Sequence, residues 1–543
     1  MKKRTVCIML VICMIISCMT SVSISVSAQS ADITEEGAAN YGLADKCKDG
    51  NILHCFNWTL NQIKDELPNI AQAGFTSVQT SPLQGHDGRN QWYWLYQPTG
   101  FSIGNELGSY DDLKALCSEA DKYGIKIIVD VVANHLAGSN NGTWANSIDS
   151  DLKKSGYFHN LGACNDWDNR YDITHKNIGM PDLNSENKDI QNKVYSMIEK
   201  LESAGVDGIR WDAAKHISLP SEDCAFWSKM AESDLYQYGE ILENPAGKSG
   251  DAVNNALMTE YAQYIGVTDS TYSSDIMNAV KSGTMYKTNG NWLKKGVAAD
   301  RIVYWAESHD TYANDGTDGW TKNIDQKLID KAYAIVGARA DSQALYLSRP
   351  SEKAKTSIYY GKKGSTHFTS KEVAAVNHFH NAMIGKAEKY SATAGCYVVW
   401  REGGAVIVSM NGSDVDVSVN NSGSMVPVGT YTDEVSGSEW TVTETKITGH
   451  IGNSGIAVVY NAEQPSEELI LGDVDGDLEA TVIDATYVQR YATHIPVPID
   501  DEVMEKCGDA DGDGDVSIVD ATFIQRYASR LPTPYKIGEV IQD

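Results

Sequence analysis

Short apolar runs alternate with stretches of helix length between about residue 45 and residue 385. Seven runs have the length and side chains typical of buried strands, and they cover residues 52–58, 77–81, 126–132, 208–213, 236–242, 301–308 and 343–348. Between them, residues 113–123 and 190–203 carry the apolar periodicity of helices. Repeated strand and helix units over this length predict a parallel barrel or a doubly wound sheet.

The pattern changes at two places along the chain. Residues 134–182 are rich in Asn, Gly, Asp and aromatic side chains, which predicts a loop domain inserted after the third strand. From residue 391 to residue 462 the apolar positions recur with period two, strictly so at 415–419, which predicts a small antiparallel β domain. Residues 463–469 are polar and contain Pro465, as in a linker.

The N-terminus has the composition of a targeting segment. Lys2, Lys3 and Arg4 precede an apolar run that is too short to span a membrane, and small residues follow at 26–28. We therefore predict a signal peptide at 1–28 and a secreted protein. The alternative is a bacterial lipoprotein signal, in which Cys18 would be acylated and hold the protein at a membrane.

Charge and cysteine content narrow the functional classes. The 543 residues include 45 Lys and Arg against 73 Asp and Glu, a formal net charge of −28. This acidity argues against a nucleic-acid partner, which requires clustered basic side chains. Seven cysteines follow the signal segment, an odd number without a CxxC or Cys/His cluster. Neither a disulfide framework nor a zinc site is therefore indicated, and free buried thiols fit this pattern.

Charged side chains gather at the ends of four predicted strands, in segments 130–135, 208–216, 238–240 and 307–310. Arg210 and Asp212 are two residues apart on one strand, so both face the same side. We expect Arg210 to hold Asp212 ionised with a low pKa, and Glu240 to lie in a drier position with a raised pKa. Two carboxyl groups with opposed environments are what glycoside cleavage requires.

These four segments, in this order and at this spacing, resemble the signature regions of the α-amylase family of retaining glycoside hydrolases. Residues 92–98, 307–315 and 379–381 resemble the secreted bacterial members of the bacillus type, and the similarity covers roughly residues 45–462. The resemblance implies a multidomain protein. It would have a (β/α)8 TIM barrel over 29–390, a calcium-binding insertion at about 134–182, and a C-terminal antiparallel β-sandwich domain over 391–462.

The resemblance also assigns roles to individual residues. Asp212 matches the nucleophile, Glu240 the general acid and base, and Asp310 the carboxylate that stabilises the transition state. Substrate-binding positions of the family match Tyr93, Tyr96, Gln97, His135, Arg210, Lys215, His216 and His309. One structural Ca²⁺ is implied at the side chains of Asn134 and Asp182 and at the main-chain carbonyls of Thr174 and His216.

Residues 470–543 contain 16 acidic and 5 basic residues and an internal repeat. Acidic groups at loop positions 1, 3, 5 and 12 and a hydroxyl at position 9 match a calcium loop twice. The predicted ligands are Asp473, Asp475, Asp477, Thr481 and Asp484, and Asp509, Asp511, Asp513, Ser517 and Asp520. Each loop runs into a similar helix, and the pair resembles a type I dockerin. Leu478 replaces the usual loop glycine, which predicts a weaker first site.

Together with the signal segment, the resemblance implies a secreted, endo-acting α-amylase that cleaves internal α-1,4-glucosidic bonds of starch and related α-glucans with retention of configuration. The resemblance implies three Ca²⁺ ions, a monomeric catalytic unit, and binding of the tail to a cohesin module of an extracellular scaffold protein. Two alternatives stay open. One is a maltooligosaccharide-forming or transglycosylating relative, and the other is a non-catalytic glucan-binding subunit.

Overall fold

The computed structural model describes residues 41–139, 143–242, 244–284, 291–393, 395–461, 469–475, 480–495, 497, 499, 501–539 and 541. The predicted signal peptide, the alternative lipoprotein Cys18, most of the predicted linker, Asp477 and Leu478 lie outside the described residues. Among the described helices, none is sufficiently long and apolar to cross a membrane.

Eight parallel strands close into a barrel in sequence order, which confirms the barrel of the two predicted arrangements. The strands are β1 (Ile52–His54), β2 (Ser77–Gln79), β3 (Lys126–Val132), β4 (Gly208–Asp212), β5 (Tyr236–Gly239), β6 (Gly266–Thr268), β7 (Ile302–Trp305) and β8 (Gln343–Leu347). Pairing of β1 with β8, Ile52 opposite Leu345, closes the ring. The sequence pattern did not predict β6, because three residues beginning with glycine are too few to show a period.

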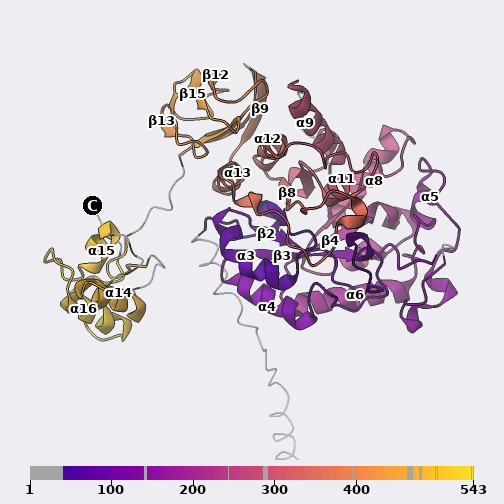
Figure 1. The fold of residues 1–543 in the computed structure, drawn as a ribbon, viewed down its shortest axis with the longest axis horizontal. Helices are drawn as coiled ribbons and strands as arrows, with labels where there is room; N and C mark the ends of the chain where they lie inside the picture. Colours follow the sequence, from indigo (N-terminus) through magenta and orange to yellow (C-terminus); the bar gives the residue numbers. More distant parts are fainter. Residues whose placement is uncertain are drawn as a thin grey trace, which may run out of the picture.

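Helices follow the strands and surround the barrel (Figure 1). They are α3 (Leu60–Gln72), α4 (Tyr110–Asp121), α6 (Lys188–Ser203), α7 (Phe226–Met230), α8 (Asp251–Tyr264), α9 (Ser270–Ser282), α10 (Asn291–Lys294), α11 (His309–Ala313), α12 (Gln326–Gly337) and α13 (Lys371–Ala382). Helices α4 and α6 begin two or three residues before their predicted starts, because Ser109 and Asn187 cap their first turns. Among the described residues of the insertion between β3 and α6 there is one α-helix, α5 (Arg170–His175).

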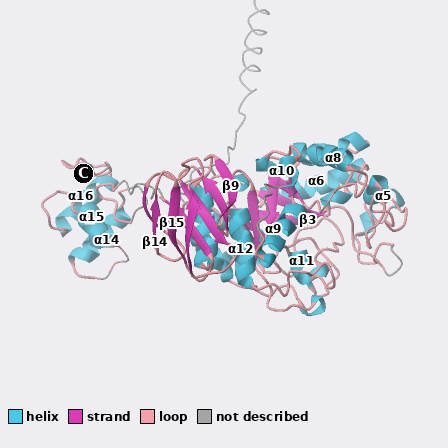
Figure 2. Cartoon of the chain, turned by 90° about the horizontal axis from the view of Figure 1, so that it is seen from above, coloured by secondary structure: helices cyan, strands magenta, loops and turns pink. Residues whose placement is uncertain are grey.

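After the barrel, two four-stranded antiparallel sheets form the predicted β-sandwich (Figure 2). The first sheet contains β9 (Glu388–Thr393), β10 (Cys396–Arg401), β11 (Gly404–Ser409) and β16 (Ile456–Tyr460). The second contains β12 (Val415–Asn420), β13 (Gly429–Thr432), β14 (Glu439–Val442) and β15 (Lys446–Ile451). Trp400 and Trp440 are fully buried between the sheets. The outer face of the first sheet joins the barrel core, and Arg339 bonds both carboxylate oxygens of Glu388 at 2.8 and 2.9 Å.

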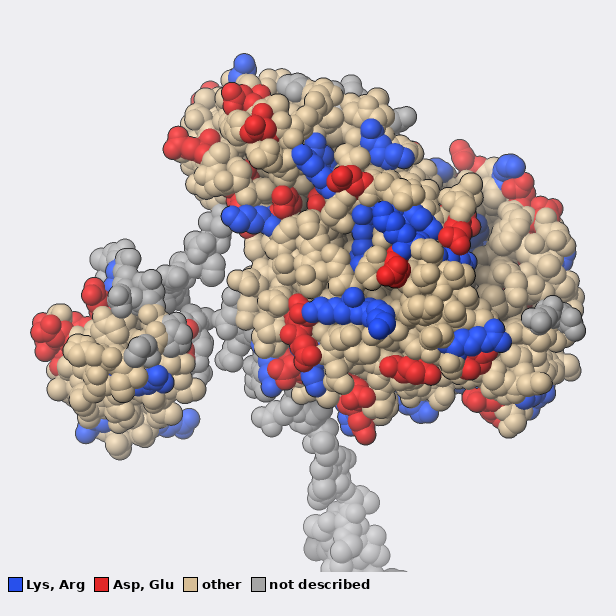
Figure 3. Space-filling model, in the orientation of Figure 1, with Lys and Arg blue, Asp and Glu red and all other residues tan. Residues whose placement is uncertain are grey.

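A small helical module ends the chain. It comprises α14 (Val482–Ala492), α15 (Asp501–Gly508) and α16 (Ile518–Ala528), and α14 packs against α16. Val488, Met504 and Ile524 are central to its own hydrophobic core. Figure 3 shows acidic side chains along one edge of this module and basic side chains elsewhere on its visible face. The module is a compact unit with a hydrophobic core of its own.

Candidate active site

The guanidinium of Arg210 lies at the centre of the strand-end cluster. Its Nη1 is 2.8 Å from Oδ1 of Asp212 and 2.9 Å from Oδ1 of Asp130, and its Nη2 is 3.0 Å from Oε2 of Glu240. The three carboxylates come from β4, from β3 and from the residue after β5. All four side chains are largely shielded from solvent. The structure thus places Asp212 and Glu240 on one shared cation.

Burial dominates the electrostatics of these carboxyl groups. It raises the pKa of Asp212 and of Glu240 above their ordinary values, and raises that of Asp130 to about 7. The expectation of a low pKa for Asp212 is therefore wrong. The reason is that one guanidinium is shared among three carboxylates, and the charge of Glu240 repels that of Asp212. The expected rise for Glu240 is confirmed in direction.

Asp310 completes the cluster from the first turn of α11. Its carboxyl group is hydrogen-bonded to that of Glu240, and two carboxyl groups in such contact must hold a proton between them. Asn314 Nδ2 donates to Oδ1 of Asp310 at 2.9 Å. Lys355 Nζ in turn donates to Asn314 Oδ1 at 2.8 Å and lies 5.6 Å from the ring centroid of Tyr93. A polar chain therefore joins the carboxylate to the predicted sugar-binding tyrosine.

Two neutral histidines border the carboxylates. His135 Nε2 donates to the carbonyl of Tyr96 at 3.0 Å, because a carbonyl can only accept. The His309 ring stacks on the Tyr96 ring, with centroids 5.1 Å apart and planes 10° apart. Burial lowers the pKa of His135 and lowers that of His309 to about 3. Tyr96 also donates its hydroxyl to Asp130 at 3.0 Å, and Gln97 follows it at the same rim, half-buried.

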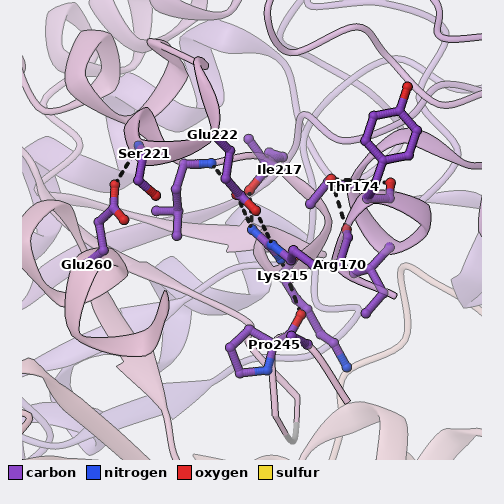
Figure 4. A network of polar contacts seen from close by, with 12 residues as sticks. Arg170, Thr174, Lys215, Ile217, Ser221, Glu222, Pro245 and Glu260 are labelled. Atoms are coloured by element: carbon purple, nitrogen blue, oxygen red, sulfur yellow. Dashed lines mark hydrogen bonds and ion pairs between the residues drawn. The ribbon is translucent and has the colours of Figure 1, made fainter. Parts of the chain in front are cut away.

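The insertion is held against the barrel by Arg170 of α5 (Figure 4). Its guanidinium donates to both oxygens of Glu222 at 2.8 and 2.9 Å and to the carbonyl of Lys215 at 2.7 Å. The backbone N–H of Lys215 donates to the carbonyl of Glu240 at 3.2 Å. His216 Nδ1 donates to the carbonyl of Ile173 at 2.8 Å. The half-buried His216 imidazole thus contacts the insertion, in addition to its predicted position beside the substrate.

The residues predicted to bind calcium in this region lie in two pairs, Asn134 close to Asp182 and Thr174 close to His216. The main-chain carbonyl of Asn134 accepts a hydrogen bond of 2.8 Å from the N–H of Leu183. The next residue, His135, pairs with Asp182 in an isolated β-bridge. Asp182 is 4% exposed, and its Oδ1 has no hydrogen-bond partner among the described residues. Thr174 is the penultimate residue of α5 and follows Ile173, whose carbonyl His216 contacts. A buried carboxylate oxygen without a hydrogen-bond donor fits a hard cation such as Ca²⁺.

The repeat loops of the tail also gather their acidic groups. Carboxylate oxygens of Asp473, Asp475 and Asp484 lie within 4.8 Å of one another, and so do those of Asp509, Asp511 and Asp520. Asp513 Oδ1 accepts the N–H of Asp515 at 2.9 Å. Thr481 and Ser517 cap α14 and α16, and each forms a capping box with the aspartate at loop position 12. Both hydroxyls therefore have a structural role besides the predicted one.

Sequence reasoning missed three residues of this site. Asp130 was recoverable, because it lies on a predicted strand directly opposite Arg210 in the parallel register. Asn314 follows the short helix α11 and bonds Asp310 four residues earlier, so it was recoverable only if that helix had been predicted. Arg170 carries no local signal, since its partner Glu222 is 52 residues away along the chain.

Comparison with known proteins agrees with this geometry. α-Amylase I of Eisenia fetida shares the fold, with a TM-score of 0.59 and 18% identity over 77% of this chain and 97% of its own. An α-amylase of Clostridium acetobutylicum is 35% identical over 457 residues, and one of Butyrivibrio fibrisolvens is 31% identical over 479 residues. These alignments cover 79% and 76% of this chain. The chain therefore carries the catalytic domain of a glycoside hydrolase.

Two family profiles identify the individual domains of the chain. Residues 47–240 match "Alpha amylase, catalytic domain", and residues 471–530 match "Dockerin type I domain". The chain thus combines an α-amylase catalytic domain with a C-terminal type I dockerin. It spans 56% and 47% of the length of the Clostridium and Butyrivibrio relatives.

The neutral state of His309 gives a direct test of the site geometry. Because burial lowers its pKa from 6.5 to about 3, its ring resonances should not titrate between pH 8 and pH 5. The unfolded chain binds this proton and the folded chain does not, so His309 lowers the free energy of unfolding as the pH falls from 6.5 towards 3. The measurement is histidine NMR, with the resonance assigned by His309→Gln.

His450 is the internal control for this titration. It is exposed and bonds Asp416 and Asp414 at 2.8 and 3.1 Å, which raise its pKa above 6.5. Its resonance should titrate above that value. A His309 titration near 6.5 would contradict the buried stacking against Tyr96.

Proposed function

We propose that this protein is an endo-acting α-amylase that hydrolyses internal α-1,4-glucosidic bonds of starch and related α-glucans with retention of configuration. The observation that carries the proposal is the shared guanidinium of Arg210, which holds Asp212 and Glu240 together while Asp310 hydrogen-bonds Glu240. The solved structure of the Eisenia fetida α-amylase with maltohexaose supports an α-glucan as the ligand class.

The arrangement supports a double displacement. Asp212 attacks the anomeric carbon as Glu240 donates its proton to the departing glycosidic oxygen, whose bond to that carbon breaks. Glu240 then takes a proton from water, the water oxygen attacks the anomeric carbon, and the ester bond to Asp212 breaks. The raised pKa of Glu240 and its bond to Asp310 support Glu240 as the group that holds the proton. Arg210 keeps Asp212 oriented.

Around these carboxyl groups, we assign substrate binding to the rim residues. Tyr93, Tyr96 and Gln97 lie on one side, with His135 and His309 beside the reacting bond. Lys215 and His216 lie on the leaving-group side, where the backbone of Lys215 contacts that of Glu240. Aromatic faces stack on sugar rings, so these residues hold the glucan independently of the carboxylates.

Asp212→Asn and Glu240→Gln should each lower kcat on soluble starch by about 10³-fold or more, because each removes a group that forms or breaks a bond. Binding of a maltooligosaccharide, measured by calorimetry, should persist. Asp207→Asn is the matched control, since Asp207 is a half-buried carboxylate directly before the opposite end of the same strand and accepts the N–H of Ile127 at 2.7 Å. Its turnover should stay close to that of the unchanged chain.

Near-normal turnover in Asp212→Asn would refute the assigned nucleophile, and a β-anomeric product in NMR would refute retention. A reducing-sugar assay with product sizing separates the alternatives. Absence of released sugar indicates a glucan-binding subunit. A single short product, or products longer than the substrate, indicates a maltooligosaccharide-forming or transglycosylating enzyme.

The oxygen cluster between insertion and barrel is proposed to hold one structural Ca²⁺. Asn134 and Asp182 would supply side-chain oxygens, and Thr174 and His216 would supply carbonyls. The ion would cross-link the insertion to the loops after β3 and β4, and it would take no part in cleavage of the glycosidic bond. The unpartnered Oδ1 of Asp182 supports this site.

Calcium should therefore raise the melting temperature of a chain ending at residue 462, because a hundredfold excess over Kd adds about 2.7 kcal/mol to the free energy of unfolding. Asp182→Asn should abolish most of this response. Asp172→Asn, which removes a surface partner of Lys176 in the same insertion, should retain it. Equal melting in chelator and in excess calcium, with metal content confirmed as zero in chelator, would exclude the site.

We further propose that the dockerin binds two Ca²⁺ and docks a cohesin module of an extracellular scaffold, with the enzyme secreted and its catalytic unit monomeric. Val482 and Ile483 at the start of α14 are 55% and 53% exposed, and Ile518 and Val519 at the start of α16 are 54% and 52% exposed. These two equivalent apolar pairs are the proposed contact surfaces. Either helix could present its pair to the partner.

Chelator should unfold the dockerin and abolish cohesin binding, because its small core leaves folding dependent on metal binding. Hydrolysis of soluble starch by a chain lacking residues 470–543 should stay close to that of the full chain. Substitution of Asp509 and Asp513 should weaken docking more than substitution of Asp473 and Asp477, given Leu478 in the first loop. Unaltered cohesin affinity in chelator would refute the calcium-dependent docking.

A further inference from the structure

Two histidines and a glutamate converge inside the insertion, away from the carboxylates of the active site. His159, His175 and Glu186 each offer one ligand atom, and these atoms lie within 4.8 Å of one another. Oε2 of Glu186 is 2.7 Å from Nε2 of His159, and its Oε1 is 3.7 Å from Nε2 of His175. The side chains are 7%, 17% and 27% exposed, in the order His159, His175, Glu186. The cluster is therefore shielded but reachable from solvent.

The hydrogen bonds of His175 fix which of its ring nitrogens faces the cluster. Its Nδ1 lies 3.2 Å from the carbonyl of Tyr171, which can only accept, and 2.8 Å from Oγ1 of Thr174. The Thr174 hydroxyl donates its hydrogen to the carbonyl of Arg170 at 3.1 Å, so it accepts from Nδ1, which carries the ring hydrogen. The Tyr171 ring stacks on the imidazole at 4.0 Å and holds its plane. In the neutral ring, the lone pair is then on Nε2, the atom that faces Glu186.

His159 is oriented in the same way by a different acceptor. Its Nδ1 is 2.5 Å from Oδ2 of the buried Asp182. A histidine that binds a metal through one ring nitrogen characteristically donates the other N–H to a carboxylate or a carbonyl. Both histidines show this arrangement, with both Nε2 atoms directed towards Glu186.

We propose that His159 Nε2, His175 Nε2 and the Glu186 carboxylate bind one divalent transition-metal ion of the Zn²⁺ class, with a fourth position left to water. Two imidazoles and one carboxylate suit Zn²⁺ better than Ca²⁺, which takes oxygen ligands. Tetrahedral bonds of about 2.05 Å place ligand atoms about 3.3 Å apart. The observed 2.7 and 3.7 Å lie on either side of that value.

This site is separate from the proposed calcium site and adjoins it through Asp182. Oδ2 of Asp182 accepts from His159, whereas Oδ1 has no partner among the described residues and stays available to calcium. The proposed ion would cross-link three segments of the insertion: the loop that carries His159, the end of α5, and the turn before α6. No sequence motif indicated this site, because its ligands are separated by 16 and 11 residues and include no cysteine.

The rival interpretation is a metal-free ion bridge, in which a protonated His159 lies between Asp182 and Glu186. That bridge requires no second imidazole, whereas metal binding requires His175. The two interpretations therefore differ in what His175 does, and the experiment is built on that residue.

The test uses the untagged full-length chain, stripped with chelator and returned to excess calcium so that calcium sites are filled. Co²⁺ is the probe, since its visible absorption reports tetrahedral nitrogen and oxygen ligation. We expect one Co²⁺ per chain, displaced by Zn²⁺ and not by calcium. His175→Gln and Glu186→Gln should each weaken Co²⁺ binding at least about tenfold. Zn²⁺ should also shift the His175 ring resonances of the unchanged chain.

His450→Gln is the matched control. His450 bridges Asp414 and Asp416 without a second histidine in that contact, so its loss should leave Co²⁺ binding unchanged. Unaltered melting in excess calcium verifies the fold of each variant, and the NMR shift needs no variant. Lack of tetrahedral Co²⁺ uptake, displacement of Co²⁺ by calcium, or unchanged affinity in His175→Gln would each overturn the proposal.

Discussion

The active site depends on one buried cation shared among three buried carboxylates. Removing such charges from water costs several kcal/mol per ion, and only close, hydrogen-bonded pairing offsets this cost. Arg210 supplies that pairing to Asp130, Asp212 and Glu240, which belong to three consecutive strands or their ends. Closure of the barrel and assembly of the reactive cluster are therefore one event. Loss of the guanidinium would leave like charges facing one another inside the barrel.

The same coupling extends outward to the insertion. Arg170 bonds the carbonyl of Lys215, whose own N–H bonds the carbonyl of Glu240. The insertion is thus joined to the residue proposed as the acid by two hydrogen bonds, one from the Arg170 side chain and one between backbone groups. Asp182, shared between His159 and the proposed calcium position, lies in the isolated β-bridge with His135. Ions bound there would act on the geometry of the site through this framework and not through the reacting bond.

Periodicity and strand-end motifs predicted the barrel, the β-sandwich and the tail repeat, because each of these features depends on residues that are close together in the sequence. The three-residue strand β6 was not predicted, since so short a strand has no period of its own. The charges of the site were predictable in identity but not in pKa. Asp212 shows why: a neighbouring arginine was visible in the sequence, whereas the two other carboxylates that share it come from β3 and the end of β5. The histidine pair at His159 and His175 likewise exists only after folding.

All seven cysteines among the described residues are buried, and none is in a disulfide. The stability of the described fold consequently does not depend on disulfides, and thiol reductants should not lower it. After unfolding, the seven thiols are exposed to solvent together and can form non-native disulfides in the presence of oxygen. Heat inactivation in air is then irreversible and is governed by the rate of unfolding. Without an oxidant, the same chain can refold to the native state.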